Sequence, residues 1–357
     1  MKFFRGFDLL IPAVVAIIGA LGLALLWSLT PNLFFQQLVF FLIGFIFFLI
    51  FSQIDFRIWQ NLRWVIYIGG ILFLVLTFIL GGMTRGSVRW IQIGPLTIQA
   101  SELVKPFFLA FFAFWFSQGK FQISKLILAI FLFFLPALLI FRQPDLGSTL
   151  VLTVAFLGIL FALDLPAPII WSGIAFFILL LPSSWLFLAQ YQKQRILSFL
   201  NPGADPLGSG YNIIQSVISV GSGQLFGRGL GKGTQSHLAF LPERHTDFIF
   251  ASYTEELGFL GAIIILVLYF LLLWRVLRVA LKTQQDYARL FSLGVFFMLL
   301  FQIFVNIGMN LGIVPVTGIT LPFFSYGGSS ILATMIALGM VESIARFQKE
   351  EGTIEIK

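Results

Sequence analysis

The chain contains no cysteine among its 357 residues, only two histidines, and only 10% charged residues. The lack of cysteine excludes structural disulfides, thiolate nucleophiles and cysteine-based metal sites. Two histidines argue against a zinc site built from imidazole ligands. About a quarter of the residues in soluble domains are charged, so the low fraction of charged residues excludes an ordinary soluble protein.

The chain is instead rich in apolar residues, at 59% with 45 Phe and a mean hydropathy of +1.00. Apolar runs long enough to cross a bilayer core of about 30 Å predict an all-α, polytopic membrane protein. We expect about ten spans, at Leu9–Leu29, Leu33–Ser52, Trp64–Leu80, Glu102–Ser117, Leu126–Phe141, Ser148–Leu163, Ile169–Leu188, Glu255–Trp274, Leu290–Leu311 and Tyr326–Ala345.

The distribution of Lys and Arg predicts the orientation of these spans. With a cytoplasmic N-terminus, thirteen basic residues fall on inner segments and three on the short outer loops. Cytoplasmic loops attract basic residues, so both termini are predicted to be cytoplasmic. The same distribution accounts for the net charge of +7 without nucleic acid as a partner.

The chain is predicted to form one integral membrane domain over residues 1–357. The first span follows Lys2 and Arg5 as in a signal peptide, but its length and the lack of a small-residue cleavage site indicate a retained helix. A loop of about 189–254, between spans 7 and 8 and outside the cytoplasm, is too long to be a simple connection.

The outer loop ends in a charged stretch, Leu241–Ala251, that places an acid, a base, a histidine and a second acid next to an apolar run. Desolvation at the mouth of a membrane helix raises the pKa of a carboxylate and suits it to proton abstraction. Asp247 is therefore a candidate general base. The alternative is a solvated loop end whose charges mark the bilayer surface.

The Gly-rich segment 221–234 has the glycine content of a phosphate-binding loop. Its Lys232 is followed by Gly and no strand precedes it, so neither nucleotide-binding pattern fits. A backbone nest for a lipid pyrophosphate and a flexible re-entrant backbone remain the two alternatives.

Other polar residues in apolar surroundings are candidates for a site or for structural roles. Glu102 and Lys105, at i and i+3, form either a functional pair or a neutralising salt bridge. Asp145 either takes part in the site or caps the next helix. Ser252-x-x-Glu255 fits a capping box, which predicts helix initiation there. Prolines and glycines make 315–330 irregular, which predicts that it lines a protein cavity with Ser325 among polar groups.

Four motifs of this sequence strongly resemble the SEDS family (shape, elongation, division, sporulation). They run in the family's order across nearly the whole chain: Arg89-Trp90-Ile91 with Gln99–Lys105, Gln143–Gly147, Phe240–Phe248 and Pro315–Ser330. The second and fourth motifs resemble the elongation branch more than the division branch. One departure is Ala100, where the family usually has Pro.

The resemblance implies a ten-helix peptidoglycan glycosyltransferase that polymerises lipid II on the outer face of the bacterial cytoplasmic membrane during elongation. It implies that Asp247 is the essential loop aspartate and that Glu102 and Lys105 are the helix-end acid and base. It also implies a class B penicillin-binding protein as the cross-linking partner, among other elongation-complex proteins.

A prenyl-pyrophosphate donor needs a base for the acceptor hydroxyl and positive charge for the departing pyrophosphate. Arg195, Lys232, Arg244 and His245 are candidates for that charge, and Trp90, Asp145 and Ser325 for supporting roles. A divalent cation such as Mg²⁺ or Mn²⁺, held by Asp247 or Glu102, is the cofactor we expect, with no organic cofactor. A lipid flippase or transporter, and a non-enzymatic scaffold, are the competing functions.

Overall fold

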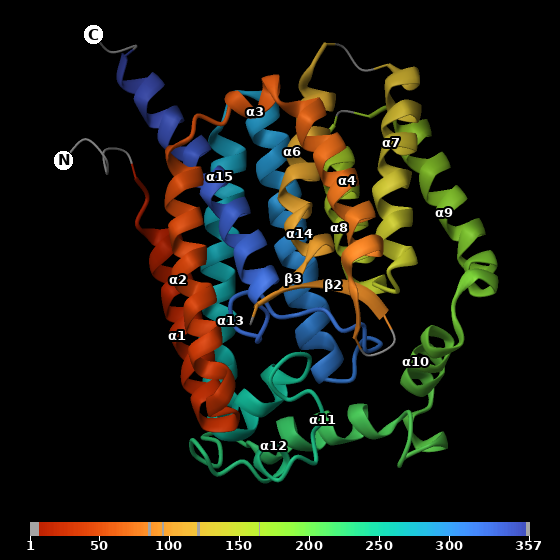
Figure 1. Ribbon diagram of the computed structural model, residues 1–357, viewed down its shortest axis with the longest axis vertical. Coiled ribbons are helices and arrows are strands. Elements are labelled where there is room, and N and C mark those ends of the chain that lie inside the picture. Colours follow the sequence, from red (N-terminus) through yellow and green to blue (C-terminus); the bar gives the residue numbers. More distant parts are fainter. Residues whose placement is uncertain (1–6, 85–86, 95, 120–121, 164, 355–357) are drawn as a thin grey trace.

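The computed structural model describes residues 7–84, 87–94, 96–119, 122–163 and 165–354. Long helices run roughly parallel and form a bundle, with both termini at one end (Figure 1). The bundle contains α1 (Leu10–Leu29), α2 (Pro31–Gln53), α4 (Arg63–Leu80), α5 (Ala100–Leu103), α6 (Lys105–Ser117), α7 (Ile123–Arg142), α8 (Leu146–Phe161), α9 (Ala167–Phe187), α13 (Ile249–Lys282), α14 (Asp286–Asn310) and α15 (Gly328–Ile354). The short helix α3 (Ile58–Asn61) joins α2 to α4.

The helices confirm the prediction of a polytopic helical membrane protein. Eight helical segments among the described residues are long and apolar enough to cross a bilayer, and the 16-residue α8 is a shorter apolar helix. The 21-residue α9 covers the remaining predicted span. Each of the ten predicted spans therefore lies on a helix, with α5 and α6 together forming the fourth.

The helices differ in how far the protein itself buries them. The membrane-length part of α15 is 100% buried, whereas the corresponding share of α4 is 17%. α15 packs along α2, and a Cβ on Gly339 would lie 2.7 Å from the Phe48 carbonyl oxygen of α2. Small residues allow such close approach between membrane helices. α15 is thus the central helix, while α2, α4 and α7 present large apolar side chains on the outside.

A small three-stranded antiparallel sheet between α4 and α5 is added to the predicted helical fold. It consists of β1 (Gly82–Thr84), β2 (Ser87–Ile93) and β3 (Leu96–Gln99) in the order β1-β2-β3. Its strands are short, and Gly94 makes the turn between β2 and β3 with a φ of 61°. The alternation of apolar and polar residues in Leu96–Gln99 is the strand signal that a reading based on hydrophobic runs passes over.

The predicted outer loop is an ordered layer at the end of the bundle opposite the termini (Figure 1). It contains α10 (Gln190–Leu200), the 3₁₀ turn η2 (Pro202–Ala204), α11 (Tyr211–Ser222) and α12 (Thr234–His237). α11 packs against both α13 and α14. The outer layer is therefore packed onto the helical bundle.

The Gly-rich segment pairs with a break in α13. At Gly258 the backbone leaves helical geometry, with φ 67° and ψ −164°. The N–H groups of Arg228 and Gly229 donate to the carbonyls of Glu255 and Glu256, while those of Phe259 and Leu260 donate to the carbonyls of Gln224 and Leu225. The N–H groups of Arg228 and Gly229 are thus bonded to the broken helix, so these two groups are not open to form an anion nest.

Alanine at Gly258 is expected to destabilise the protein. A Cβ there would lie 2.3 Å from the Gly227 nitrogen and 2.6 Å from the Leu225 oxygen, on a backbone of positive φ. Left-handed strain and overpacking together predict a loss of about 2–4 kcal/mol in the free energy of unfolding. Thermal unfolding in detergent measures this loss.

Gly221 provides the matched control for this substitution. It lies in helix α11, and a Cβ there would meet nothing within 4 Å. Gly221→Ala is therefore expected to be neutral or to stabilise by about 0.5–1 kcal/mol. Equal melting temperatures for the two variants would contradict the proposed cause.

Candidate active site

Asp247 lies at the start of α13, at the junction of the outer layer and the bundle. Phe248 is the N-cap of this helix, so Asp247 is the last residue before the helix boundary. The main-chain carbonyl of Asp247 accepts hydrogen bonds from the Nδ2 atoms of Asn310 (2.9 Å) and Asn306 (3.2 Å) on α14. The residue is half-buried.

The irregular segment before α15 lies directly against the loop that carries Asp247. Ser325 Oγ donates to the Thr246 carbonyl (2.7 Å) and accepts from the Leu321 N–H (2.9 Å). The Tyr326 N–H donates to the His245 carbonyl (2.9 Å). Ser325 therefore sits among polar groups, and the chain turns before α15 begins at Gly328, as predicted.

Two glutamines of α2 support this segment from the bundle side. Gln37 Nε2 donates to the Ser325 carbonyl, and Gln37 Oε1 accepts from the Gly327 N–H. The Tyr326 hydroxyl donates to Gln36 Oε1 at 2.7 Å. Burial raises the pKa of the Tyr326 hydroxyl, which keeps it protonated as the donor. Sequence reasoning missed both glutamines, although two adjacent amides in an apolar span are themselves a signal.

Arg195 of α10 reaches the same place from the outer layer. Its Nη1 donates to the Val316 carbonyl at 3.4 Å. A Cβ on Gly318 would lie 3.6 Å from Asp247 Oδ2 and 3.9 Å from Arg195 Nη1. The carboxylate and the guanidinium therefore border one small volume at Gly318, whose φ is 75°.

Glu102 and Lys105 form a largely buried ion pair at the start of the fourth span. Lys105 Nζ lies 2.5 Å from Glu102 Oε1, and the two side chains are 2% and 12% exposed. Ser148 Oγ donates to the same Glu102 oxygen at 2.9 Å. The expected contact is present, and it extends to the first turn of α8.

Asp145 caps α8 and also joins it to the sheet. Its Oδ1 accepts from the Ser148 N–H, while its Oδ2 accepts from Gln99 Nε2 (2.6 Å) and Ser101 Oγ (2.7 Å). Trp90 is the cross-strand partner of Gln99. Asp145 thus caps the helix, which is one of the two roles expected for it, and Trp90 lies beside that cluster.

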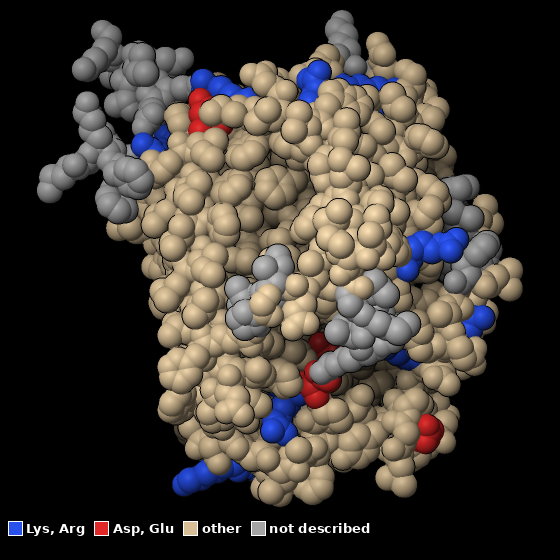
Figure 2. Space-filling model, in the orientation of Figure 1, with Lys and Arg blue, Asp and Glu red and all other residues tan. Residues whose placement is uncertain are grey.

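The Asp145 cluster adjoins the segment around Gly318, which in turn borders Asp247. A Cβ on Gly147 would lie 3.2 Å from the Thr317 carbonyl oxygen and 3.0 Å from Ile319, the residues on either side of Gly318. Figure 2 shows acidic side chains in a hollowed part of the surface above the outer layer, with a basic side chain close by. Residues from four separated motifs therefore meet at one end of the bundle.

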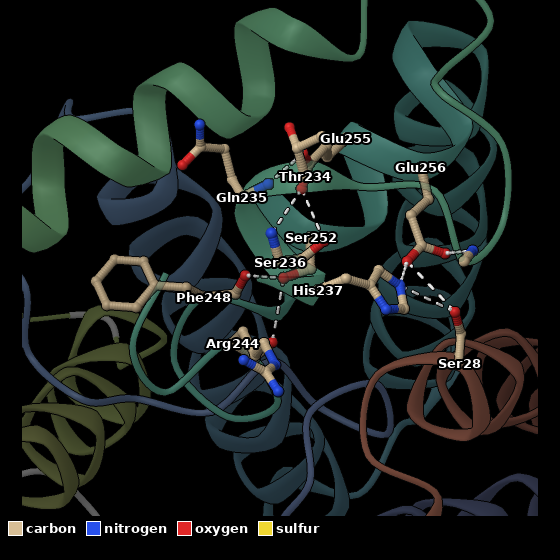
Figure 3. A network of polar contacts seen from close by, with 11 residues as sticks. Ser28, Thr234, Gln235, Ser236, His237, Arg244, Phe248, Ser252, Glu255 and Glu256 are labelled. Atoms are coloured by element: carbon tan, nitrogen blue, oxygen red, sulfur yellow. Dashed lines mark hydrogen bonds and ion pairs between the residues drawn. The ribbon is translucent and has the colours of Figure 1, made fainter. Parts of the chain in front are cut away.

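Glu255 does not initiate a helix, which corrects the capping-box prediction. It lies inside α13, which begins six residues earlier at Ile249, and its carboxylate accepts from the N–H groups of Gln235 and Ser236 and from Ser236 Oγ (Figure 3). The Ser-x-x-Glu pattern predicts a contact within one helix turn. The buried Glu255 carboxylate instead accepts hydrogen bonds from the first turn of α12. The tertiary contact therefore decides its role.

Glu256 holds the Gly-rich segment to α1. Its Oε1 lies 2.7 Å from His237 Nε2 and 3.4 Å from Ser28 Oγ, and its Oε2 accepts from the Gly231 N–H (Figure 3). Lys232 follows Gly231 and is exposed. Among the described residues no contact joins Lys232 to Asp247, so the structure does not bring this candidate to the site.

Arg244 and His245 lie on the same loop as Asp247. The Arg244 carbonyl accepts from Ser252 Oγ at 3.4 Å (Figure 3). Arg244 Nε is buried and has no hydrogen-bond partner in the part of the chain that the structure describes. The His245 ring packs edge-on against Tyr326, with ring centroids 5.9 Å apart.

The residues present offer a divalent cation few protein ligands. No group of three or more His, Cys, Asp or Glu side chains suited to a metal occurs among the described residues. Glu102 Oε1 is already bonded to Lys105 and Ser148. A cation would therefore fit only as Mg²⁺ commonly binds, through one or two carboxylates together with substrate phosphates.

Comparison with known proteins gives the family. A family model described as a cell cycle protein, covering FtsW, RodA and SpoVE, matches residues 4–350. The peptidoglycan glycosyltransferase MrdB of Escherichia coli K12 is 39% identical over 309 residues, which cover 86% of this chain and 84% of that protein.

Two solved structures agree with that match. One chain in a peptidoglycan synthase complex that coordinates polymerization and crosslinking is 33% identical, with a TM-score of 0.83 and coverage of 96% of this chain and 98% of that one. The crystal structure of RodA from Thermus thermophilus is 30% identical, with a TM-score of 0.72 and coverage of 95% and 97%. The chain therefore belongs to the FtsW, RodA and SpoVE family, the SEDS peptidoglycan glycosyltransferases.

Proposed function

We propose that this glycosyltransferase polymerises lipid II into glycan strands on the outer face of the bacterial cytoplasmic membrane, in cell elongation, with Asp247 as the general base. The observation that carries the proposal is that the Asp247 carboxylate and the Arg195 guanidinium both lie close to Gly318. A base beside a fixed cation is the pair that transfer from a prenyl pyrophosphate needs.

In this reaction the acceptor hydroxyl oxygen bonds to the anomeric carbon of the donor sugar. The bond from that carbon to the pyrophosphate oxygen breaks, and the prenyl pyrophosphate leaves with the electron pair. Asp247 removes the hydroxyl proton, while Arg195 and Arg244 stabilise the negative charge of the leaving group. Arg244 Nε, which is buried and has no hydrogen-bond partner among the described residues, supports this second role.

A divalent cation such as Mg²⁺ or Mn²⁺, when bound, would supply further positive charge to the leaving pyrophosphate. Asp247 is the residue that would hold it with the substrate's own oxygens, because Glu102 is engaged by Lys105 and Ser148. The segment around Gly318 is then oriented by packing against the part of the protein that contains Glu102, Lys105 and Asp145.

The membrane orientation and the partner follow the same reasoning. Both termini lie at the same end of the bundle (Figure 1), and the excess of Lys and Arg on the segments predicted to lie at that end supports a cytoplasmic position for them. A class B penicillin-binding protein is the proposed cross-linking partner. Similarity to a chain of a peptidoglycan synthase complex supports that partner.

Purified protein with labelled lipid II tests the proposal. Incubation without a chelator is expected to give glycan strands on a gel. Addition of a chelator, which removes the cation, is expected to give fewer strands. The competing transporter function would use the broken helix α13. Movement of lipid II across vesicles without any strand synthesis would favour that function and refute polymerisation.

A further inference from the structure

Two fully buried asparagines on α14 have no place in the proposed chemistry. Asn306 and Asn310 are each 0% exposed and lie one helical turn apart, on one face of a membrane helix. A buried amide is costly in such surroundings unless its hydrogen bonds are satisfied. The Asn306 amide bonds to both chain segments that meet at Gly318, and the Asn310 amide bonds to the segment that carries Asp247.

Asn310 completes the start of α13 from a neighbouring helix. Its Oδ1 accepts from the Ala251 N–H at 2.9 Å, and its Nδ2 donates to the Asp247 carbonyl at 2.9 Å. Ala251 is the third residue of α13, whose N–H has no partner within the helix. The N-cap Phe248 has no side chain that can accept this bond, so Asn310 supplies the cap.

Asn306 links the loop that carries Asp247 to the segment that contains Ile319. Its Nδ2 donates to the Ile319 carbonyl at 2.7 Å and to the Asp247 carbonyl at 3.2 Å. Ile319 follows Gly318, the residue that borders both the Asp247 carboxylate and Arg195. One amide thus sets the separation of the two segments that flank the proposed reaction site.

We propose that Asn306 and Asn310 are positioning residues that fix the Asp247 carboxylate relative to the substrate. The proposal rests on the proposed role of Asp247 as the base. Both amides hold the main chain of Asp247, and the carboxylate that would take the proton belongs to that same residue. Their effect therefore reaches the reaction through Asp247.

Replacement of either asparagine is expected to reduce turnover with little effect on substrate binding. A misplacement of about 1 Å in a catalytic group lowers the rate by about 10²-fold. Asn306→Leu and Asn310→Leu are thus each expected to lower kcat by about 10²-fold and to leave KM almost unchanged. A longer amide, in Asn306→Gln, is expected to recover part of the loss because it keeps the donor.

Gln302 provides the matched control. It lies one turn before Asn306 on α14, is 2% exposed, and its Oε1 has no hydrogen-bond partner among the described residues. Gln302→Leu removes a buried amide from the same helix without touching Asp247, so kcat is expected to stay near that of the unmodified protein. Thermal unfolding of all variants in detergent reports any difference in folding.

A double-mutant cycle separates positioning from general damage. If Asn306 acts through Asp247, then adding Asn306→Leu to Asp247→Asn is expected to lower the residual rate no further. A general structural defect would instead multiply the two losses. Multiplied losses, or a kcat for Asn306→Leu equal to that of Gln302→Leu, would overturn the proposal.

The same variants distinguish this proposal from the assignment of the base. Full activity in Asp247→Asn alone would refute the base, whereas inactivity there with full activity in both asparagine variants would refute positioning only. If leucine at position 306 prevents folding, the smaller change Asn306→Ser takes its place in the cycle, with the same expected loss of kcat at constant KM.

Discussion

Asp247→Asn is expected to lower the rate of glycan polymerisation by about 10²–10⁴-fold, the usual cost of losing a general base. Asparagine keeps the size of the side chain and removes its basicity. The bonds from Asn306 and Asn310 go to the main-chain carbonyl of Asp247, so the substitution leaves them in place. Folding is therefore expected to change little, and a labelled lipid II assay measures the rate.

Glu243→Gln is the matched control for this substitution. Glu243 lies on the same loop, and its Oε2 accepts from Thr246 Oγ1 at 3.2 Å, a bond that a glutamine oxygen can keep. Strand synthesis by this variant is expected to remain close to normal. Near-normal synthesis by Asp247→Asn would remove Asp247 from the mechanism.

Breaking the Glu102–Lys105 pair is expected to give the largest loss of stability. The Lys105 side chain is 2% exposed, so Glu102→Gln leaves a cation buried without its counter-charge. Loss of one partner of a buried ion pair costs about 3–5 kcal/mol. Thermal unfolding in detergent is expected to show a large fall for Glu102→Gln, and also for Lys105→Met.

Reversal of both charges separates the structural from the functional role of this pair. Glu102→Lys with Lys105→Glu restores the attraction, so stability is expected to recover in part. Activity is expected to stay low, because a lysine at 102 cannot accept the bond from Ser148 Oγ. Full recovery of polymerisation would show that Glu102 and Lys105 only neutralise each other.

Hydropathy and spacing predict the helical bundle well, because a bilayer imposes length and apolarity on each span separately. They make Asp247 a candidate, but only the resemblance to the SEDS family favours it over a solvated loop end. The sheet at 82–99 was missed because its strands are short and lie between two hydrophobic runs. Local periodicity carries that information, and average hydropathy does not.

The supporting residues of the site could not be predicted in the same way. Asn306 and Asn310 sit inside an apolar span, and only the arrangement of α13 beside α14 shows what their amides bind. Glu255 matched a local helix-start pattern, yet it bonds residues about twenty positions earlier. Hydrogen bonds between distant segments are fixed by tertiary structure, so spacing along the chain does not reveal them.

The break at Gly258 has a mechanical consequence for a protein in a bilayer of varying thickness. A straight helix of 34 residues would be about 51 Å long, well above a hydrocarbon core of about 30 Å. The break divides α13 into a rod that crosses the membrane and a short outer piece bonded to the Gly-rich segment. A thinner membrane tilts long rods. Because the Gly-rich segment also bonds Phe259 and Leu260 of the rod, a tilt of the rod is expected to reach the outer piece, which begins next to Asp247, through that segment.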